Sequence, residues 1–205
     1  MIKNSESAST DVADFQLDDG RFDHASIVLH WLTVLLIVVQ FTSIWAREAF
    51  EHHGNVGAAL LSLHRSTGVL TWFVTATRLV WRRWFADLPP FPSSMPKFQQ
   101  TAAKANEYGL YVLLLTMPIT GLMRVLLRGQ PFDLLLWQVP ALLNPNPEMR
   151  NLFVAAHEIG ATALMLLIAL HALAALFHHL VLRDRVLQRM LPRISKQTKL
   201  THGAG

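Results

Sequence analysis

Long apolar stretches divide this chain into four segments of similar length. The clearest covers residues 27–46, twenty consecutive positions without Asp, Glu, Lys or Arg. About 20 apolar residues are needed for a helix to cross the hydrocarbon core of a bilayer. Comparable stretches follow at residues 60–82, 105–127 and 155–182. The pattern therefore predicts four transmembrane helices at these positions.

Two of these segments depart from a plain apolar span. The second carries Arg65 and Arg78, so hydropathy alone rates it as marginal, and its charges need a buried partner or access to the interface. The third contains Pro118 and Gly121, which predict a kink of the kind that helical bundles tolerate.

The connecting segments are polar or rich in proline. Residues 83–104 are so dense in proline that they are predicted to form a stiff loop. Residues 129–151 mix four prolines with the apolar run 134–137, which is too short to cross and is expected at the interface. Residues 1–24 resemble a disordered cytoplasmic arm rather than a signal peptide, and residues 183–205 form a basic cytoplasmic tail. One membrane domain, residues 25–182, lies between them.

The distribution of basic residues predicts the orientation. Twelve of the 18 lysines and arginines precede residue 27, lie between residues 82 and 104 or follow residue 182, and five lie at the opposite ends of the spans. Because basic residues gather on the cytoplasmic side, both termini are expected in the cytoplasm. The isoelectric point near 9.9 is thus explained by membrane topology, and no nucleic-acid partner is expected.

Composition limits the chemistry that the chain can perform. Apolar residues make up 52% of the sequence and the mean hydropathy is +0.31, as expected for a protein in contact with lipid. Cysteine is absent, which excludes disulfides, thiolate-bound zinc, iron–sulfur clusters and covalently attached c-type haem. A metal or haem must therefore be held by histidine, methionine or carboxylate.

Four of the histidines within the predicted spans, His30, His64, His157 and His171, lie at informative depths. His157 and His171 are fourteen residues apart, which places them on one helix face about 21 Å from each other. In an up-and-down bundle, His30 and His171 are predicted at one membrane depth, and His64 and His157 at another. The histidines are therefore expected to pair in this way. Two neutral imidazoles on opposing helices fill both axial positions of a haem iron, so two non-covalent haems b are predicted, with these histidines as ligands.

Other polar residues of the spans fit the same hypothesis. Gly68, Thr71 and Thr75 share a face of the second span with Arg78, and small side chains there leave room for a flat ring. Arg65 and Arg78 are candidates to pair with haem propionates, which would offset the cost of burying them. His178 is a candidate to hydrogen-bond a propionate or a quinone carbonyl. Equally, His178 and His179 together fit a pair of histidines at the membrane interface.

Copper and zinc also bind imidazole, so a histidine-lined metal-ion transporter is the alternative from another functional class. Each predicted layer offers only two histidines, however, and no third ligand converges on the inner one. A transporter is also expected to line a continuous polar path, whereas Leu164, Leu167 and Ile168 separate the two layers.

Several short strings, taken together from about residue 21 to 193, resemble the bacterial cytochrome b561 family. They are SIVLHWL at 26–32, LHRSTG at 63–68, PITG at 118–121, RGQP at 128–131, HE at 157–158, LHA at 170–172 and FHH at 177–179. Glu107 stands where a histidine often opens the third span in that family.

The resemblance implies a diheme, quinone-linked cytochrome of the bacterial inner membrane. It implies that His30 and His171 bind the cytoplasmic haem and that His64 and His157 bind the periplasmic one. One branch of the family oxidises periplasmic superoxide and reduces ubiquinone, and Arg124, Arg128 and Arg150 would then attract the anion. Another implied role is the membrane-anchor cytochrome b subunit of a hydrogenase or dehydrogenase, with a redox protein as partner.

The sequence as a whole predicts an all-α, integral membrane four-helix up-and-down bundle that encloses two haems b. Its predicted function is electron transfer to or from the quinone pool, with superoxide:ubiquinone oxidoreductase activity as one specific form.

Overall fold

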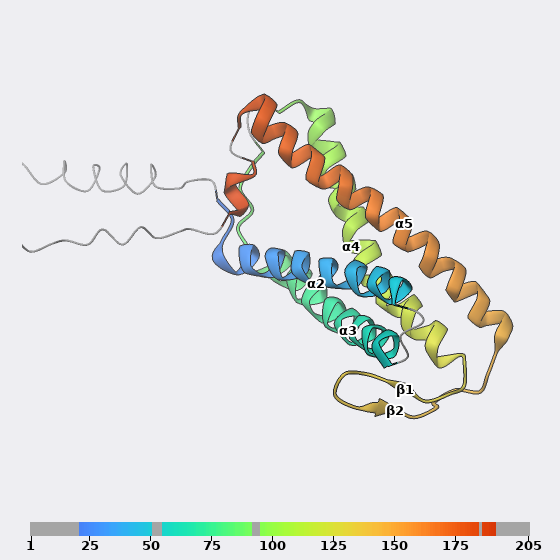
Figure 1. Ribbon diagram of the computed structural model, residues 1–205. Coiled ribbons are helices and arrows are strands. Elements are labelled where there is room, and N and C mark those ends of the chain that lie inside the picture. The colour runs from blue at the N-terminus through green and yellow to red at the C-terminus, as the bar shows by residue number, and fades with distance from the viewer. Residues whose placement is uncertain (1–20, 51–54, 92–94, 185, 192–205) are drawn as a thin grey trace, which may run out of the picture.

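The computed structural model describes residues 21–50, 55–91, 95–184 and 186–191 of the chain (Figure 1). The predicted arm, up to residue 20, and the predicted tail, from residue 192, lie outside the described residues. The prediction that these segments are disordered or basic extensions therefore stays a prediction.

Four long helices make up most of the described chain. They are α2 (His24–Ala49), α3 (Asn55–Trp84), α4 (Lys97–Leu126) and α5 (Pro147–Phe177). The prediction of an all-α bundle with four helices is confirmed. The helices extend beyond the predicted apolar spans at most ends, because polar residues continue the helices past the apolar stretches.

Two predicted loops are shorter than expected. Residues 97–104 were predicted to be non-helical and are helical, because Pro96 occupies the N-cap of α4 and no further proline follows until Pro118 within the helix. α5 also begins ahead of the last predicted span, which was expected to start at residue 155. Pro147 lies in the first turn of α5, where a missing N–H costs nothing, and the Asn146 side chain caps the helix by accepting from the Met149 amide.

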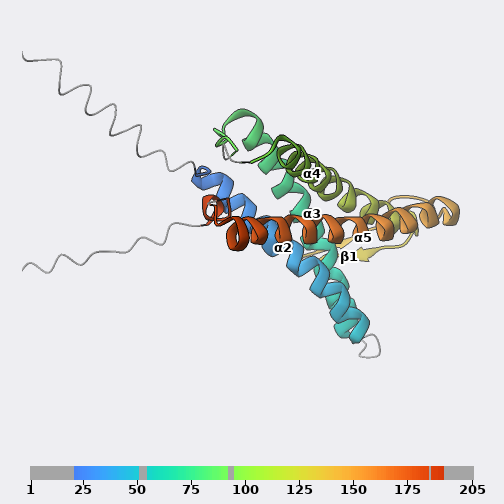
Figure 2. The same ribbon diagram turned by 90° about the horizontal axis from the view of Figure 1, so that it is seen from above.

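The four helices form two helical hairpins. α2 packs closely along α3 and α4 packs along α5, whereas α3 and α4 make fewer contacts with each other. Figures 1 and 2 show the two hairpins meeting at an angle. Side chains that connect α2 or α3 with α5 therefore bridge separate units of the bundle.

Small polar side chains fill much of the α2–α3 contact. Thr33 and Ser43 of α2 are buried, as are Ser62, Thr71 and Thr75 of α3. Small residues let helix backbones approach closely, which is how helices associate where lipid removes the usual hydrophobic driving force. Many large apolar side chains of the helices are instead exposed.

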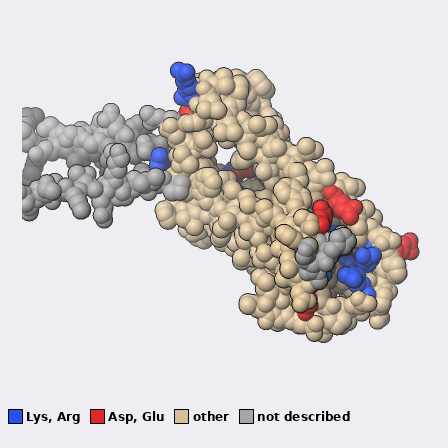
Figure 3. Space-filling view, in the orientation of Figure 1, with Lys and Arg blue, Asp and Glu red and all other residues tan. Residues whose placement is uncertain are grey.

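Three of the described helical segments are long and apolar enough to cross a membrane, namely His24–Ala49, Lys97–Leu126 and Pro147–Leu182. α3, which carries Arg65 and Arg78, is not among them, in line with its marginal hydropathy. In the view of Figure 3, Lys, Arg, Asp and Glu side chains gather near opposite ends of the molecule, and the surface between them is mostly uncharged. This distribution fits an integral membrane protein.

A short β-hairpin closes the α4–α5 connection. β1 (Phe132–Asp133) pairs antiparallel with β2 (Gln138–Val139), and the Leu134 amide donates to the Trp137 carbonyl across the turn. The Leu135 amide also donates to Ser66 Oγ, which ties the β-hairpin to α3. The apolar run 134–137 thus forms the turn of this hairpin, and its predicted place at a membrane interface stays a prediction.

The last predicted span continues past α5 as a single π-helical turn, His178–Leu182. Arg183 then adopts a left-handed conformation, with φ 54°, and its amide donates to the His178 carbonyl. This turn ends the helical segment close to the predicted limit at residue 182.

Candidate haem sites

The four predicted ligand histidines form two pairs in the structure. The hairpin-end pair, near the β-hairpin, consists of His64 on α3 and His157 on α5, with ring centroids 6.5 Å apart. The tail-end pair, near the described chain ends, consists of His30 on α2 and His171 on α5, with centroids 6.3 Å apart. The structure therefore brings together the partners that helix depth predicted.

The separation within each pair suits a metal atom between the rings. A bond from imidazole nitrogen to a metal is about 2.0–2.1 Å, so two such bonds hold the facing nitrogens about 4 Å apart, with each ring centre farther out. Ring centroids at 6.3 and 6.5 Å are compatible with this arrangement. The two rings of each pair come from different helical hairpins, which is where an inserted macrocycle would bridge the bundle.

Both rings of the hairpin-end pair have hydrogen-bond partners on Nδ1. His64 Nδ1 lies 3.1 Å from the backbone carbonyl oxygen of Gln40, and His157 Nδ1 lies 3.0 Å from Thr120 Oγ1. With Nδ1 engaged, Nε2 of each ring remains for ligation, as is usual for metal-bound histidines. Sequence reasoning missed both partners, although Thr120 lies in one of the family-like strings.

The Gln40 side chain adds a second link between α2 and α3. Its Nε2 donates to the His64 carbonyl at 3.0 Å and to Thr67 Oγ1 at 2.8 Å. Gly68 lies against this amide, since a Cβ at position 68 would be 3.4 Å from Gln40 Nε2. The predicted role of Gly68 in making room for a flat ring is therefore replaced by one in helix packing.

The tail-end pair has a different environment. His30 Nδ1 is buried and has no hydrogen-bond partner among the described residues, and His171 is exposed on α5. Arg78 of α3 is close enough to act electrostatically on both rings. This end therefore has a nearby positive charge but no described acceptor for the ring nitrogens.

The two arginines predicted to bind propionates lie at opposite ends. The Arg65 guanidinium lies over the Phe132 ring of the β-hairpin, 5.6 Å from its centroid, and that of Arg78 lies over the Tyr111 ring at 5.4 Å. Arg65 Nε and Tyr111 Oη are buried without a hydrogen-bond partner among the described residues. Polar atoms of this kind are suited to a carboxylate ligand.

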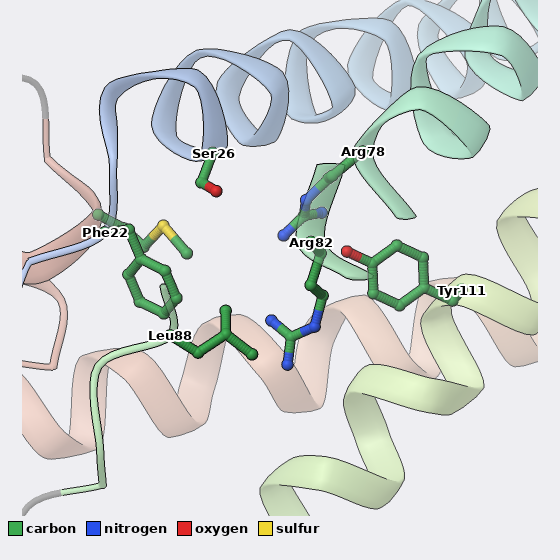
Figure 4. Close-up of a pocket in the computed structure, with 7 residues that line it drawn as sticks. Phe22, Ser26, Arg78, Arg82, Leu88 and Tyr111 are labelled. Carbon is green, nitrogen blue, oxygen red and sulfur yellow. The ribbon is translucent and has the colours of Figure 1, made fainter. Parts of the chain in front are cut away.

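A small cavity lies beside Arg78, and Figure 4 shows the seven residues that line it, six of them labelled. Arg78 and Arg82 extend into it from α3, Tyr111 from α4 and Ser26 from α2. Arg82 is already paired, because its guanidinium makes two contacts of 2.8 and 2.9 Å with the Glu107 carboxylate. Of the two arginines, Arg78 is thus the one not engaged in an ion pair within the described residues.

His178 lies apart from the tail-end pair in the π-helical turn. The residue is buried, and its Nδ1 is hydrogen-bonded to the Asp184 carboxylate. Sequence reasoning missed Asp184, which the left-handed turn at Arg183 folds back toward His178. Nε2 has no described partner, and its predicted bond to a propionate or a quinone stays a prediction.

The described residues contain no group of three or more His, Cys, Asp or Glu side chains that could hold a metal ion. Structural and catalytic zinc sites use three or four protein ligands. Pairs of histidines suit the two axial positions of a haem iron better.

Comparison with known proteins agrees with this geometry. The family model for prokaryotic cytochrome b561 matches residues 21–193. Cytochrome b561 homolog 1 of Escherichia coli (strain K12) is 31% identical over 174 residues, covering 85% of this chain and 98% of that protein. The probable superoxide oxidase CybB of Yersinia pestis is 28% identical over 178 residues, covering 84% and 97%. The chain therefore belongs to the prokaryotic cytochrome b561 family, membrane proteins that transfer electrons with haem b.

Proposed function

We propose that the protein is a diheme cytochrome that carries electrons across the bacterial inner membrane. The observation that supports this most strongly is the presence of two histidine pairs, each joining opposed helices at a ring separation of 6.3 or 6.5 Å. In each pair the two imidazoles would hold the iron of one haem b, and a haem bound there would supply a one-electron couple for electron transfer.

α5 sets the distance between the two sites. It contributes one ligand to each, and the helical rise places His157 and His171 about 21 Å apart. The chain's own residues thereby fix two redox centres at different membrane depths without moving parts. Arg65 and Arg78 would bind the propionates of the two haems.

The ends of the bundle have separate roles in this proposal. The hairpin end faces the periplasm, and Arg124, Arg128 and Arg150 lie around it at the end of α4, in the connection and at the start of α5. Positive charge of this kind raises the local concentration of an anion. The name of the CybB relative supports superoxide as that anion.

The tail end faces the cytoplasm together with both termini and delivers electrons to ubiquinone. Two superoxide anions lose one electron each and leave as dioxygen, and one ubiquinone takes up both electrons and two protons to become ubiquinol. His178, oriented by Asp184, hydrogen-bonds a quinone carbonyl through Nε2.

The test is a measurement on purified protein in liposomes that contain ubiquinone. A pyridine haemochrome assay should give two haems b per chain, and superoxide generated outside should reduce first the haems and then the quinone. Two haems without superoxide-driven quinol would retain the diheme cytochrome and reject the substrate. A single haem, or none, would reject the proposal itself.

A further inference from the structure

Thr120 makes two contacts with one hydroxyl group. Its Oγ1 lies 2.9 Å from the Met117 carbonyl oxygen and 3.0 Å from His157 Nδ1. The carbonyl can only accept, so the single hydroxyl proton is donated to Met117. Both contacts are then hydrogen bonds only when His157 Nδ1 carries a proton and donates it to Thr120.

The opposite ring is held in the same tautomer. The acceptor for His64 Nδ1 is the backbone carbonyl of Gln40, at 3.1 Å, which cannot donate. Ser43 Oγ donates to this carbonyl as well, at 3.0 Å. Both rings of the hairpin-end pair therefore have their unprotonated nitrogen at Nε2.

Gly121, the residue after Thr120 on α4, lies close against the His157 ring. A Cβ at residue 121 would lie 3.0 Å from His157 Cε1 and 3.4 Å from Nδ1. Thr120 and Gly121 thus fix the ring together, one by a hydrogen bond and the other by close packing. These two contacts from α4 set the orientation of the His157 ring.

The tail-end pair lacks this support within the described residues. His30 Nδ1 is buried without a partner, and no hydrogen bond connects either ring of that pair to a described residue. Positive charge does not distinguish the two pairs, because each has a nearby arginine. Arg78 lies near the tail-end rings and Arg124 near the hairpin-end rings. The acceptors on Nδ1 are the feature specific to the hairpin end.

We propose that Thr120 is a positioning residue that orients His157 and tunes its electron donation to the hairpin-end haem. An acceptor on Nδ1 makes the imidazole a more basic ligand, which favours the oxidised iron. Thr120 therefore lowers the midpoint potential of that haem and helps the electron to leave toward the tail-end site. This inference rests on the proposed function, in which His64 and His157 bind one haem.

The test compares Thr120→Val, which keeps the side-chain shape but removes the acceptor, with Thr120→Ser, which retains the hydroxyl. Thr116→Val is the matched control, because the Thr116 hydroxyl bonds only to carbonyls of its own helix and is exposed. Redox titrations of each purified variant, followed by visible and low-spin EPR spectra, measure the two midpoint potentials separately.

We expect Thr120→Val to raise the midpoint potential of one haem and change its EPR signal, with the other haem unaffected. Thr120→Ser and Thr116→Val should both keep the wild-type midpoint potentials and EPR signals. Loss of one haem in Thr120→Val with retention in Thr120→Ser would equally support the proposal. Unchanged potentials in Thr120→Val, or loss of haem in both Thr120 variants, would overturn it.

These outcomes are separate from failure of the proposed function. Two haems in the wild type with no response to Thr120→Val reject only the role of Thr120. A wild-type protein without two haems rejects the sites themselves.

Discussion

Gly121 on α4 lies directly against the imidazole of His157 on α5. A Cβ at this position would be 3.0 Å from His157 Cε1, which is too close unless the ring moves. The position therefore couples the backbone of one helix to the orientation of a candidate ligand on the next. A larger residue here should disturb the hairpin-end pair and leave the tail-end pair intact.

We expect Gly121→Val to lower the haem content from two per chain toward one, because the added side chain displaces His157. Gly121→Ala should have a smaller effect of the same kind, since overpacking by one methyl group costs about 1–3 kcal/mol. The measurement is the haem-to-protein ratio of the purified variants. Gly57→Ala is the control, because among the described residues a Cβ there would meet only a backbone oxygen at 3.9 Å. Full haem content and unchanged spectra in Gly121→Val would contradict the predicted contact.

Asp23 should make an acid-sensitive contribution to stability. Its carboxylate accepts from the Ser26 amide and hydroxyl at 3.0 and 2.6 Å and from Trp81 Nε1 at 2.9 Å, so it caps α2 and ties it to α3. Burial by itself would raise the pKa of Asp23, but the hydrogen bonds from Ser26 and Trp81 outweigh it and lower the pKa below the ordinary 3.8.

A lowered pKa means that this stabilisation is complete above the unfolded-state value of 3.8 and is lost as the pH falls through the lower folded value. We expect Asp23→Ala to cost about 1 kcal/mol near neutral pH, a typical value for loss of an N-cap. Thermal unfolding in detergent at neutral and acidic pH measures the difference. It should shrink in acid, and a constant difference at all pH values would contradict the assignment.

The Arg82–Glu107 ion pair should stabilise the contact between the two helical hairpins. The pair is bidentate, joins α3 to α4 where contacts are fewer, and leaves its side chains 28% and 29% exposed. A double-mutant cycle with Arg82→Met and Glu107→Gln should give a coupling free energy of about 1 kcal/mol. Because the pair is partly exposed, the coupling should fall at high salt. Zero coupling at low salt would show that the pair contributes nothing.

Arg128 should influence how fast an anionic substrate reaches the hairpin end. The residue is exposed in the connection after α4, so Arg128→Gln should reduce the rate of haem reduction by superoxide a few-fold at low ionic strength. The difference from wild type should diminish with added salt, because screening shortens the range of the field. Arg83→Gln is the charge-matched control, because Arg83 lies in the last turn of α3, away from the hairpin end. Equal rate losses in both variants would argue against a local effect.

The sequence was sufficient to predict four helices and both histidine pairs, because apolar length and helical spacing are local properties of the chain. It misplaced the start of α4, since the prolines before residue 97 suggested a longer loop than the helix needs after Pro96. It also missed Gln40 and Thr120 as partners of the histidines. These contacts join residues of different helices, and helical periodicity within one segment carries no information about them.

The same limit applies to Gly68, Asp184 and Glu107. Gly68 looked like space for a ring and instead receives the Gln40 side chain. Asp184 reaches His178 only because Arg183 takes a left-handed conformation that no pattern in the sequence indicated. Glu107 stood out as a departure from the family, but its partner Arg82 became evident only when α3 and α4 were placed side by side.

The central claim is that the two histidine pairs bind two separate haems, and four single variants test it most directly. Haem content and midpoint potentials should be measured for His30→Ala, His64→Ala, His157→Ala and His171→Ala, each purified from cells with ample haem. We predict that His64→Ala and His157→Ala lose the same haem and that His30→Ala and His171→Ala lose the other. Loss of different haems by the two members of one pair, or two intact haems in every variant, would contradict the account.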